Sequence, residues 1–80
     1  MNKLEEKLLK LGYKTAIDYD GILGIKEVNQ ADLVIKISNE NKNHNYVYSY
    51  SRCFDSQQDI DNLQQAFNQL QKDLEVLQNE

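Results

Sequence analysis

The first twelve residues carry leucines at a helical spacing of three to four positions: Leu4, Leu8 and Leu11. Asn2 is followed three residues later by Glu5, which has the form of a helix capping box. Gly12 comes directly after the last leucine, and glycine is a common residue just past the end of a helix. The pattern predicts a short amphipathic helix from Asn2 to Leu11.

From residue 13 onward the spacing changes to alternation, which is typical of a strand with one buried face. Residues 13–19 alternate in this way and end at Asp20-Gly21. This dipeptide is favoured in two-residue hairpin turns because both of its residues tolerate positive φ. The sequence therefore predicts a hairpin between residues 13–19 and residues 22–28.

The register of this hairpin is open. A two-residue loop pairs Tyr19 with Ile22 and leaves Leu23 and Ile25 on the face opposite Ile17. That arrangement divides the large apolar side chains between the two faces of the sheet. A longer or bulged turn is the alternative that would remove the conflict.

Two more alternating segments, residues 32–38 and 46–52, predict a third and a fourth strand on either side of a polar loop. One face of the fourth strand carries Tyr46, Tyr48 and Tyr50. If Ser38 opposes Asn45, the three rings face the aliphatic side of the third strand and belong to the core. A shift of one residue would set them on the open sheet face, as a strip for protein binding. We favour the core arrangement because it gathers aliphatic and aromatic residues.

The last segment shows the longest apolar pattern, in steps of three and four: Ile60, Leu63, Phe67, Leu70, Leu74 and Leu77. This spacing is the seam of a heptad repeat and predicts a helix from Ser56 to Asn79, capped by Asp55 or Ser56. Phe67 lies at its centre, so replacing Phe67 by Ala is expected to cost about 3–5 kcal/mol. Together the elements predict an α+β fold of one domain, residues 1–80. In this fold an antiparallel meander of three to four strands carries a short N-terminal helix and a long C-terminal helix on one face.

The predicted last helix is longer than the strands beneath it. At 1.5 Å per residue it spans about 36 Å, whereas a seven-residue strand spans about 23 Å. We expect its C-terminal turns to extend past the sheet, and the apolar residues there form a candidate protein interface: Leu70, Leu74, Val76 and Leu77. We favour cover of these residues by the first helix, and a homodimer is the alternative that would bury them.

Charge adds a second candidate surface. The chain has a formal net charge of -4, and all of the excess lies after residue 55. Nucleic-acid binding needs clustered positive charge, so no direct contact with nucleic acid is expected. Acids on the last helix could instead substitute for phosphates as a candidate acidic mimic face: Asp59, Asp61, Asp73 and Glu75.

The sequence offers little material for catalysis or for a cofactor. Cys53 and His44 are the only cysteine and the only histidine, too few for a structural zinc site, and neither stands in a nucleophile motif. The acids around Asp20-Gly21 lack the later ligands of a calcium loop, and no glycine-rich phosphate loop is present. We expect no enzymatic activity, no cofactor, no metal, no membrane contact and a cytoplasmic location.

The segment from Asp55 to Leu74, DSQQDIDNLQQAFNQLQKDL, resembles the C-terminal helix of small phage and prophage proteins of low-GC Gram-positive bacteria. Eight Lys against one Arg suit an AT-rich genome of that kind. The order of elements and the acidic balance are also similar to a small anti-CRISPR protein that blocks its nuclease by mimicking DNA. The resemblance covers about a quarter of the chain and implies no catalytic residue.

These observations favour a non-enzymatic phage or mobile-element accessory protein that acts by binding another protein. The alternative is an acidic mimic that inhibits a host nucleic-acid-binding protein such as a CRISPR nuclease. High salt should weaken the second kind of complex steeply and the first kind little.

Overall fold

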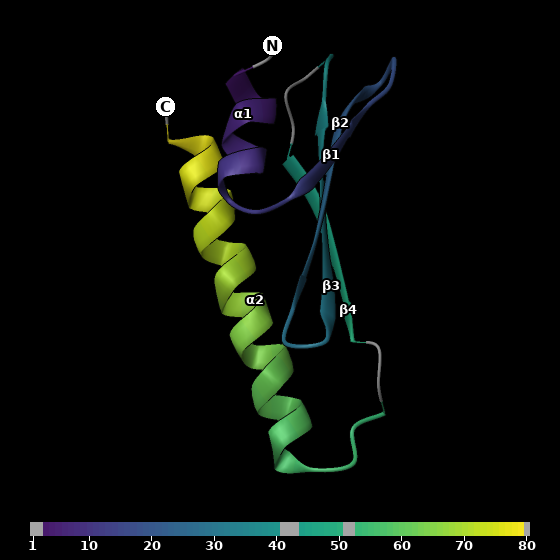
Figure 1. Cartoon of the computed structure of the whole chain (residues 1–80), viewed down its shortest axis with the longest axis vertical. Helices are drawn as coiled ribbons and strands as arrows, with labels where there is room; N and C mark the ends of the chain where they lie inside the picture. Colours follow the sequence, from purple (N-terminus) through teal and green to yellow (C-terminus); the bar gives the residue numbers. More distant parts are fainter. Residues whose placement is uncertain (1–2, 41–43, 51–52, 80) are drawn as a thin grey trace.

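The computed structural model describes residues 3–40, 44–50 and 53–79. In chain order the elements are α1 (Lys3–Lys10), β1 (Lys14–Ile17), β2 (Gly21–Val28), β3 (Ala31–Ser38), β4 (His44–Tyr50) and α2 (Gln57–Gln78). The four strands form one antiparallel sheet in the order β1-β2-β3-β4. Both helices lie on the same face of the sheet (Figure 1), so the α+β meander expected from the sequence is confirmed.

The end of α1 shows how local sequence sets an element boundary. The backbone N–H of Tyr13 donates to the carbonyl of Leu8, and that of Gly12 donates to the carbonyl of Leu9, both at 3.0 Å. These two bonds form a Schellman motif, which requires a left-handed residue, and Gly12 has φ 96°. The chain therefore turns toward β1 at Gly12, as expected. The Asn2 half of the expected capping box lies outside the described residues.

The β1–β2 hairpin corrects the turn that the sequence suggested. Ile17 rather than Tyr19 pairs with Ile22, and three residues, Asp18–Asp20, connect the two strands. The Asp18 carboxylate accepts hydrogen bonds from the backbone N–H groups of Asp20 and Gly21, at 2.8 and 2.9 Å. The longer turn does not move Leu23 and Ile25 to the sheet face that carries Ile17 and Ile22. Ile25 is 46% exposed on the sheet face away from the helices.

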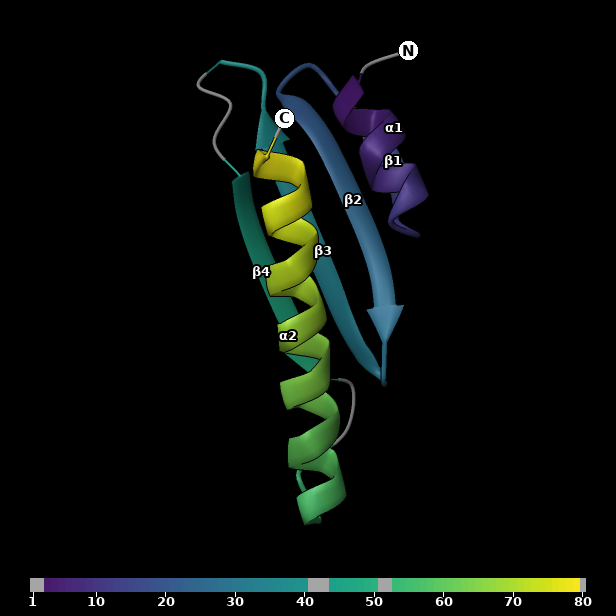
Figure 2. The ribbon, with the colours of Figure 1, turned by 90° about the vertical axis from the view of Figure 1, so that its left-hand side faces the viewer.

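The β3–β4 register differs by two residues from the expected one. Asn45 pairs with Lys36 rather than with Ser38. Because a shift of two preserves the alternation, the tyrosines of β4 stay on the helix-facing side, opposite buried residues of β3. Tyr46 and Tyr48 are nevertheless 42% and 41% exposed. β4 is an edge strand, and in Figure 2 α2 runs along both β3 and β4 and so covers β4 only in part.

The core lies between the central strands and the two helices. Its largest fully buried apolar side chains come from three elements, α1, β3 and α2: Leu8, Leu33, Ile35, Ile37, Leu70 and Leu77. Gly24 lets α1 approach the sheet, because a Cβ atom at that position would lie 3.1 Å from the Leu8 side chain and 3.3 Å from Tyr13. The core is therefore concentrated where α1, β2, β3 and the C-terminal half of α2 meet.

The helix α2 overhangs the sheet at the end opposite to the one we expected. Its C-terminal half packs beside α1, whereas its N-terminal turns extend past the ends of the strands (Figures 1 and 2). Residues 53–56 lie beyond the ends of the strands (Figure 1), and α2 follows the N-cap Ser56, whose side chain accepts from the backbone N–H of Asp59. The connection thus places the start of the helix outside the sheet, and the expectation of a C-terminal overhang was wrong.

Candidate functional site

A buried polar cluster fastens the C-terminal half of α2 to the rest of the fold. Asp73 is 1% exposed. One oxygen of its carboxylate, Oδ2, accepts from the Tyr13 hydroxyl and from Lys26 Nζ, both at 2.8 Å. The other oxygen accepts from Gln69 Nε2 at 2.9 Å. The charge of Asp73 is therefore neutralised inside the protein and is not presented to a partner.

The same cluster also contacts the end of α1. Lys26 Nζ also donates to the carbonyl of Leu11 at 2.8 Å, next to the end of α1, and lies 4.5 Å from the centre of the Tyr13 ring. Burial, and then the hydrogen bond and charge of Asp73, raise the pKa of Tyr13 well above its ordinary value. Tyr13 therefore stays protonated and serves as a donor. The cluster joins α1, β2 and α2, which is a structural role.

A second tyrosine–aspartate pair fastens the N-terminal end of α2. Asp59 is 6% exposed, and its Oδ1 accepts from the Tyr50 hydroxyl at 2.8 Å. Its Oδ2 accepts from the backbone N–H of Asp55 at 2.9 Å and from the Ser56 hydroxyl at 3.2 Å. Asp59 thus connects the last residue of β4 to the first turn of the helix, where a negative charge is also favoured by the helix dipole.

The burial of these two aspartates removes the candidate acidic mimic face. Of its four predicted members, Asp59 and Asp73 are buried, and only Asp61 and Glu75 are exposed. Those two lie 14 positions apart, which is about 21 Å along a helix. Lys72, which is exposed, stands between them in the sequence. The four acids do not form one continuous surface.

The predicted apolar interface also falls mostly inside the chain. Leu70, Leu74 and Leu77 are buried in the core, at 0%, 8% and 1% exposure. Only Val76 is exposed, at 47%. The first helix covers these leucines, as in the arrangement that we favoured over a homodimer, and the sheet contributes to their burial as well.

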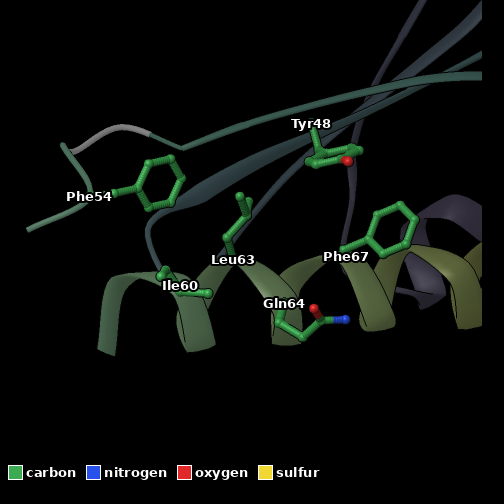
Figure 3. A pocket seen from close by; sticks show the side chains of 6 residues that line it. All are labelled: Tyr48, Phe54, Ile60, Leu63, Gln64 and Phe67. Carbon is green, nitrogen blue, oxygen red and sulfur yellow. The ribbon is translucent and has the colours of Figure 1, made fainter. Parts of the chain in front are cut away.

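An apolar groove lies instead at the other end of α2 (Figure 3). It has a volume of about 620 Å³ and is lined by Tyr48, Phe54, Ile60, Leu63, Gln64 and Phe67. The helix supplies one wall, β4 supplies Tyr48, and the connection between them supplies Phe54. Phe54 and Ile60 are 55% and 51% exposed. Large apolar side chains are thus gathered in a concave surface that is open to solvent.

Aromatic contacts hold the groove in shape. The rings of Tyr48 and Phe67 lie 5.0 Å apart between centroids, tilted by 49°, and join the strand to the helix. Phe54 stacks on Tyr50 at 5.2 Å, with 9° between the ring planes. Tyr50 is itself hydrogen-bonded to Asp59. The groove residue Phe54 is therefore linked through Tyr50 to Asp59 in the first turn of α2.

Sequence reasoning missed this groove although half of its residues belong to the predicted seam. Ile60, Leu63 and Phe67 have the same spacing as the buried leucines, and the spacing alone does not tell which end lies over the sheet. The comparison of helix length with strand length was the useful signal. This comparison correctly predicted that α2 overhangs the sheet, but the overhang was assigned to the wrong end of the helix. Phe54 follows no pattern, and only the tertiary structure brings it into the groove.

Other candidate groups stay apart. His44 is the first residue of β4 and Cys53 follows the end of this strand, whose seven residues span about 23 Å, too far for a nucleophile and its base. Cys53 is exposed and free. In the described part of the chain, no three His, Cys, Asp or Glu side chains are grouped as metal ligands. A smaller hollow of about 260 Å³ on the open sheet face includes Val34 and Val47.

No family model matches this chain, and neither a curated protein nor a solved structure is significantly similar to it. Among residues 3–40, 44–50 and 53–79, neither helix is long and apolar enough to cross a membrane.

Proposed function

We propose that this protein is a non-enzymatic binding protein and that the groove between β4 and the N-terminal half of α2 receives a segment of another protein. One observation carries the proposal: Phe54 and Ile60 remain about half exposed beside a concave apolar surface of about 620 Å³. Large apolar side chains that stay in water cost free energy, and their concentration in one concavity is typical of a recognition site.

The competing surfaces are weaker. The hollow on the open sheet face is less than half as large and includes the charged Lys36. The acidic mimic would have to use Asp61 and Glu75 alone, because its other two members are buried. The phage or mobile-element origin and the cytoplasmic location stay predictions from the sequence.

Two matched substitutions on α2 test the proposal. Ile60 and Val76 are both β-branched, both about half exposed, and each is next to an acidic residue, but only Ile60 lines the groove. We would attach wild type, Ile60→Glu and Val76→Glu to beads and quantify by mass spectrometry the proteins that each retains from a lysate of the natural host cells. The expected result is a set of proteins retained by wild type and Val76→Glu and lost by Ile60→Glu.

Circular dichroism melts of the three proteins provide the folding control, and we expect similar thermal midpoints because both positions are exposed. Retention that is equal for Ile60→Glu and Val76→Glu would show that the groove is not the binding site and would contradict the proposal.

A further inference from the structure

The two edges of the sheet are protected to different degrees. β1 has four residues, begins with Lys14 and lies against α1. β4 has seven residues, HNYVYSY, with no Lys, Arg, Asp, Glu or Pro among them. Short length, charge and proline are the usual features that keep an edge strand from pairing with another chain. β4 has none of these features, and within the described residues its only strand partner is β3.

The free edge of β4 and the groove lie next to each other, because Tyr48 belongs to both. A strand added outside β4 would run about 4.8 Å away and point every second side chain to the helix side of the sheet. On that side, a side chain of the added strand that lies next to Tyr48 would point toward the groove residues Phe54, Ile60 and Leu63. Main-chain pairing and an apolar anchor can therefore act together, as in strand-addition recognition.

Charge indicates what should flank the anchor. Residues 44–71 contain the acids Asp55, Asp59 and Asp61 and the single base Arg52, so three negative charges and one positive charge give -2. Asp55 directly follows Phe54, Asp61 directly follows Ile60, and both acids are exposed. A second copy of this chain that presented the same face would carry the same two acids and would not complement them. A segment that carries Lys or Arg beside its anchor would complement them.

We propose that the occupant is an extended, basic segment of another protein that pairs with β4 as a fifth strand. Its anchor, a large aliphatic or aromatic residue, fills the groove, and Lys or Arg residues next to the anchor face Asp55 and Asp61. This inference rests on the proposed function and adds the conformation and charge of the partner.

The test starts from an unbiased probe, a phage-displayed library of random peptides of about nine residues, long enough to cover β4. The full chain is the bait, and elution with free wild-type protein selects the binders. We expect enriched peptides to contain no proline in their central part, apolar residues two positions apart, and flanking Lys or Arg.

Fluorescence anisotropy of the most enriched peptide then gives its Kd for each variant. Ile60→Glu should weaken binding by about tenfold or more, and Val76→Glu by less than about twofold.

Two further measurements address the strand and the charge separately. N-methylation of single backbone amides along the peptide should weaken binding by about tenfold at alternate positions and little between them, because only every second amide of a strand faces its neighbour. Charge reversal of Asp61 should weaken binding more than the same change at Glu75, which is also exposed on α2 but does not adjoin a groove residue. Asp61→Lys and Glu75→Lys form that matched pair.

The outcomes separate this inference from the proposed function. Peptides that depend on Ile60 but tolerate every N-methyl group, or that are enriched in Asp and Glu, would overturn the extended basic strand and leave the groove as a binding site. Peptides that bind Ile60→Glu and wild type equally would contradict both. A library without binders would overturn the inference. So would sedimentation equilibrium that shows a wild-type dimer near about 100 µM that Ile60→Glu abolishes, because a second copy would then fill the groove.

Discussion

The two halves of α2 carry the same apolar spacing and have different environments. In the C-terminal half, Leu70 and Leu77 are almost completely buried in one core with residues of α1 and the central strands. In the N-terminal half, Ile60 is 51% exposed, and Leu63 and Phe67 line an open groove. The apolar spacing is the same along the helix, but the sheet and α1 cover mainly its C-terminal end. An apolar stripe therefore predicts which face of a helix is to be buried. It does not predict whether the same chain or another molecule covers that face.

Each half is also held by a tyrosine that donates a hydrogen bond to an aspartate of α2. Tyr13 donates to Asp73, and Tyr50 donates to Asp59, each at 2.8 Å. The two aspartates are 14 positions apart, close to four helical turns. The first pair includes Lys26 and connects three elements, whereas the second connects β4 to the helix start. We expect the first to contribute more to the stability of the fold.

Removal of the carboxylate from the covered half should have the largest effect. Asp73→Ala leaves Lys26 as a mostly buried charge without its partner, and such a change costs about 3–5 kcal/mol. This is comparable with the total stability of a domain of this size. Urea denaturation should therefore show a mostly unfolded protein. The control is Glu75→Ala, an exposed acid on the same helix, which should stay within about 0.5 kcal/mol of wild type.

Truncation of one apolar residue in each half tests the comparison directly. Leu70→Ala should lower the free energy of unfolding by about 3 kcal/mol because Leu70 is fully buried. Phe67→Ala should cost about 1–2 kcal/mol, less than the sequence alone suggested, because Phe67 is only partly buried beside the groove. A Phe67→Ala protein that is less stable than Leu70→Ala in urea would show that the groove belongs to the core.

The hydrogen bond at the start of α2 should contribute less to the stability of the fold than the buried side chain of Leu70. Tyr50→Phe removes the hydroxyl that donates to the Asp59 carboxylate and leaves the ring stacked on Phe54. A hydrogen bond to a charged group in a partly buried site is worth about 1.5–2 kcal/mol. Urea unfolding of Tyr50→Phe measures this loss. Tyr19→Phe, at a position that is 92% exposed, is the control and should match wild type.

Alkaline pH should weaken the covered half through Tyr13. The pKa of Tyr13 is raised in the folded protein above its ordinary value of 10.0, first by burial and then by Asp73. Above about pH 10 the unfolded chain releases this proton and the folded chain keeps it. The free energy of unfolding therefore falls with rising pH, by at most about 1.4 kcal/mol per pH unit from this group. Below pH 10 the contribution is fully present.

Tyr13→Phe removes this titration, so its stability should fall less steeply than that of wild type between about pH 9.5 and 11. Parallel urea titrations across this range measure the two slopes. Equal slopes would mean that Tyr13 is not held in its protonated form by burial and by Asp73.

The sequence by itself determined the elements of this protein and the faces of its strands. The leucine spacing and Gly12 located α1, Asp55-Ser56 located the start of α2, and the alternation in β4 placed its three tyrosines on one face of the sheet. These features depend on interactions within a few residues or on the period of two, which survives a register shift of two. They could be predicted without knowledge of the fold.

Only the tertiary structure decided the length of the β1–β2 loop, which end of α2 overhangs the sheet, and what the acids of that helix do. Asp73 is a surface charge in the sequence pattern and becomes a buried acceptor because Tyr13, 60 positions away, and Lys26, 47 positions away, converge on it. Phe54 likewise enters the groove only in the folded chain, which sets it beside Ile60 and Leu63 of α2. Contacts between residues so distant in the chain leave no periodic signal, because each is created by the packing of elements that are already formed.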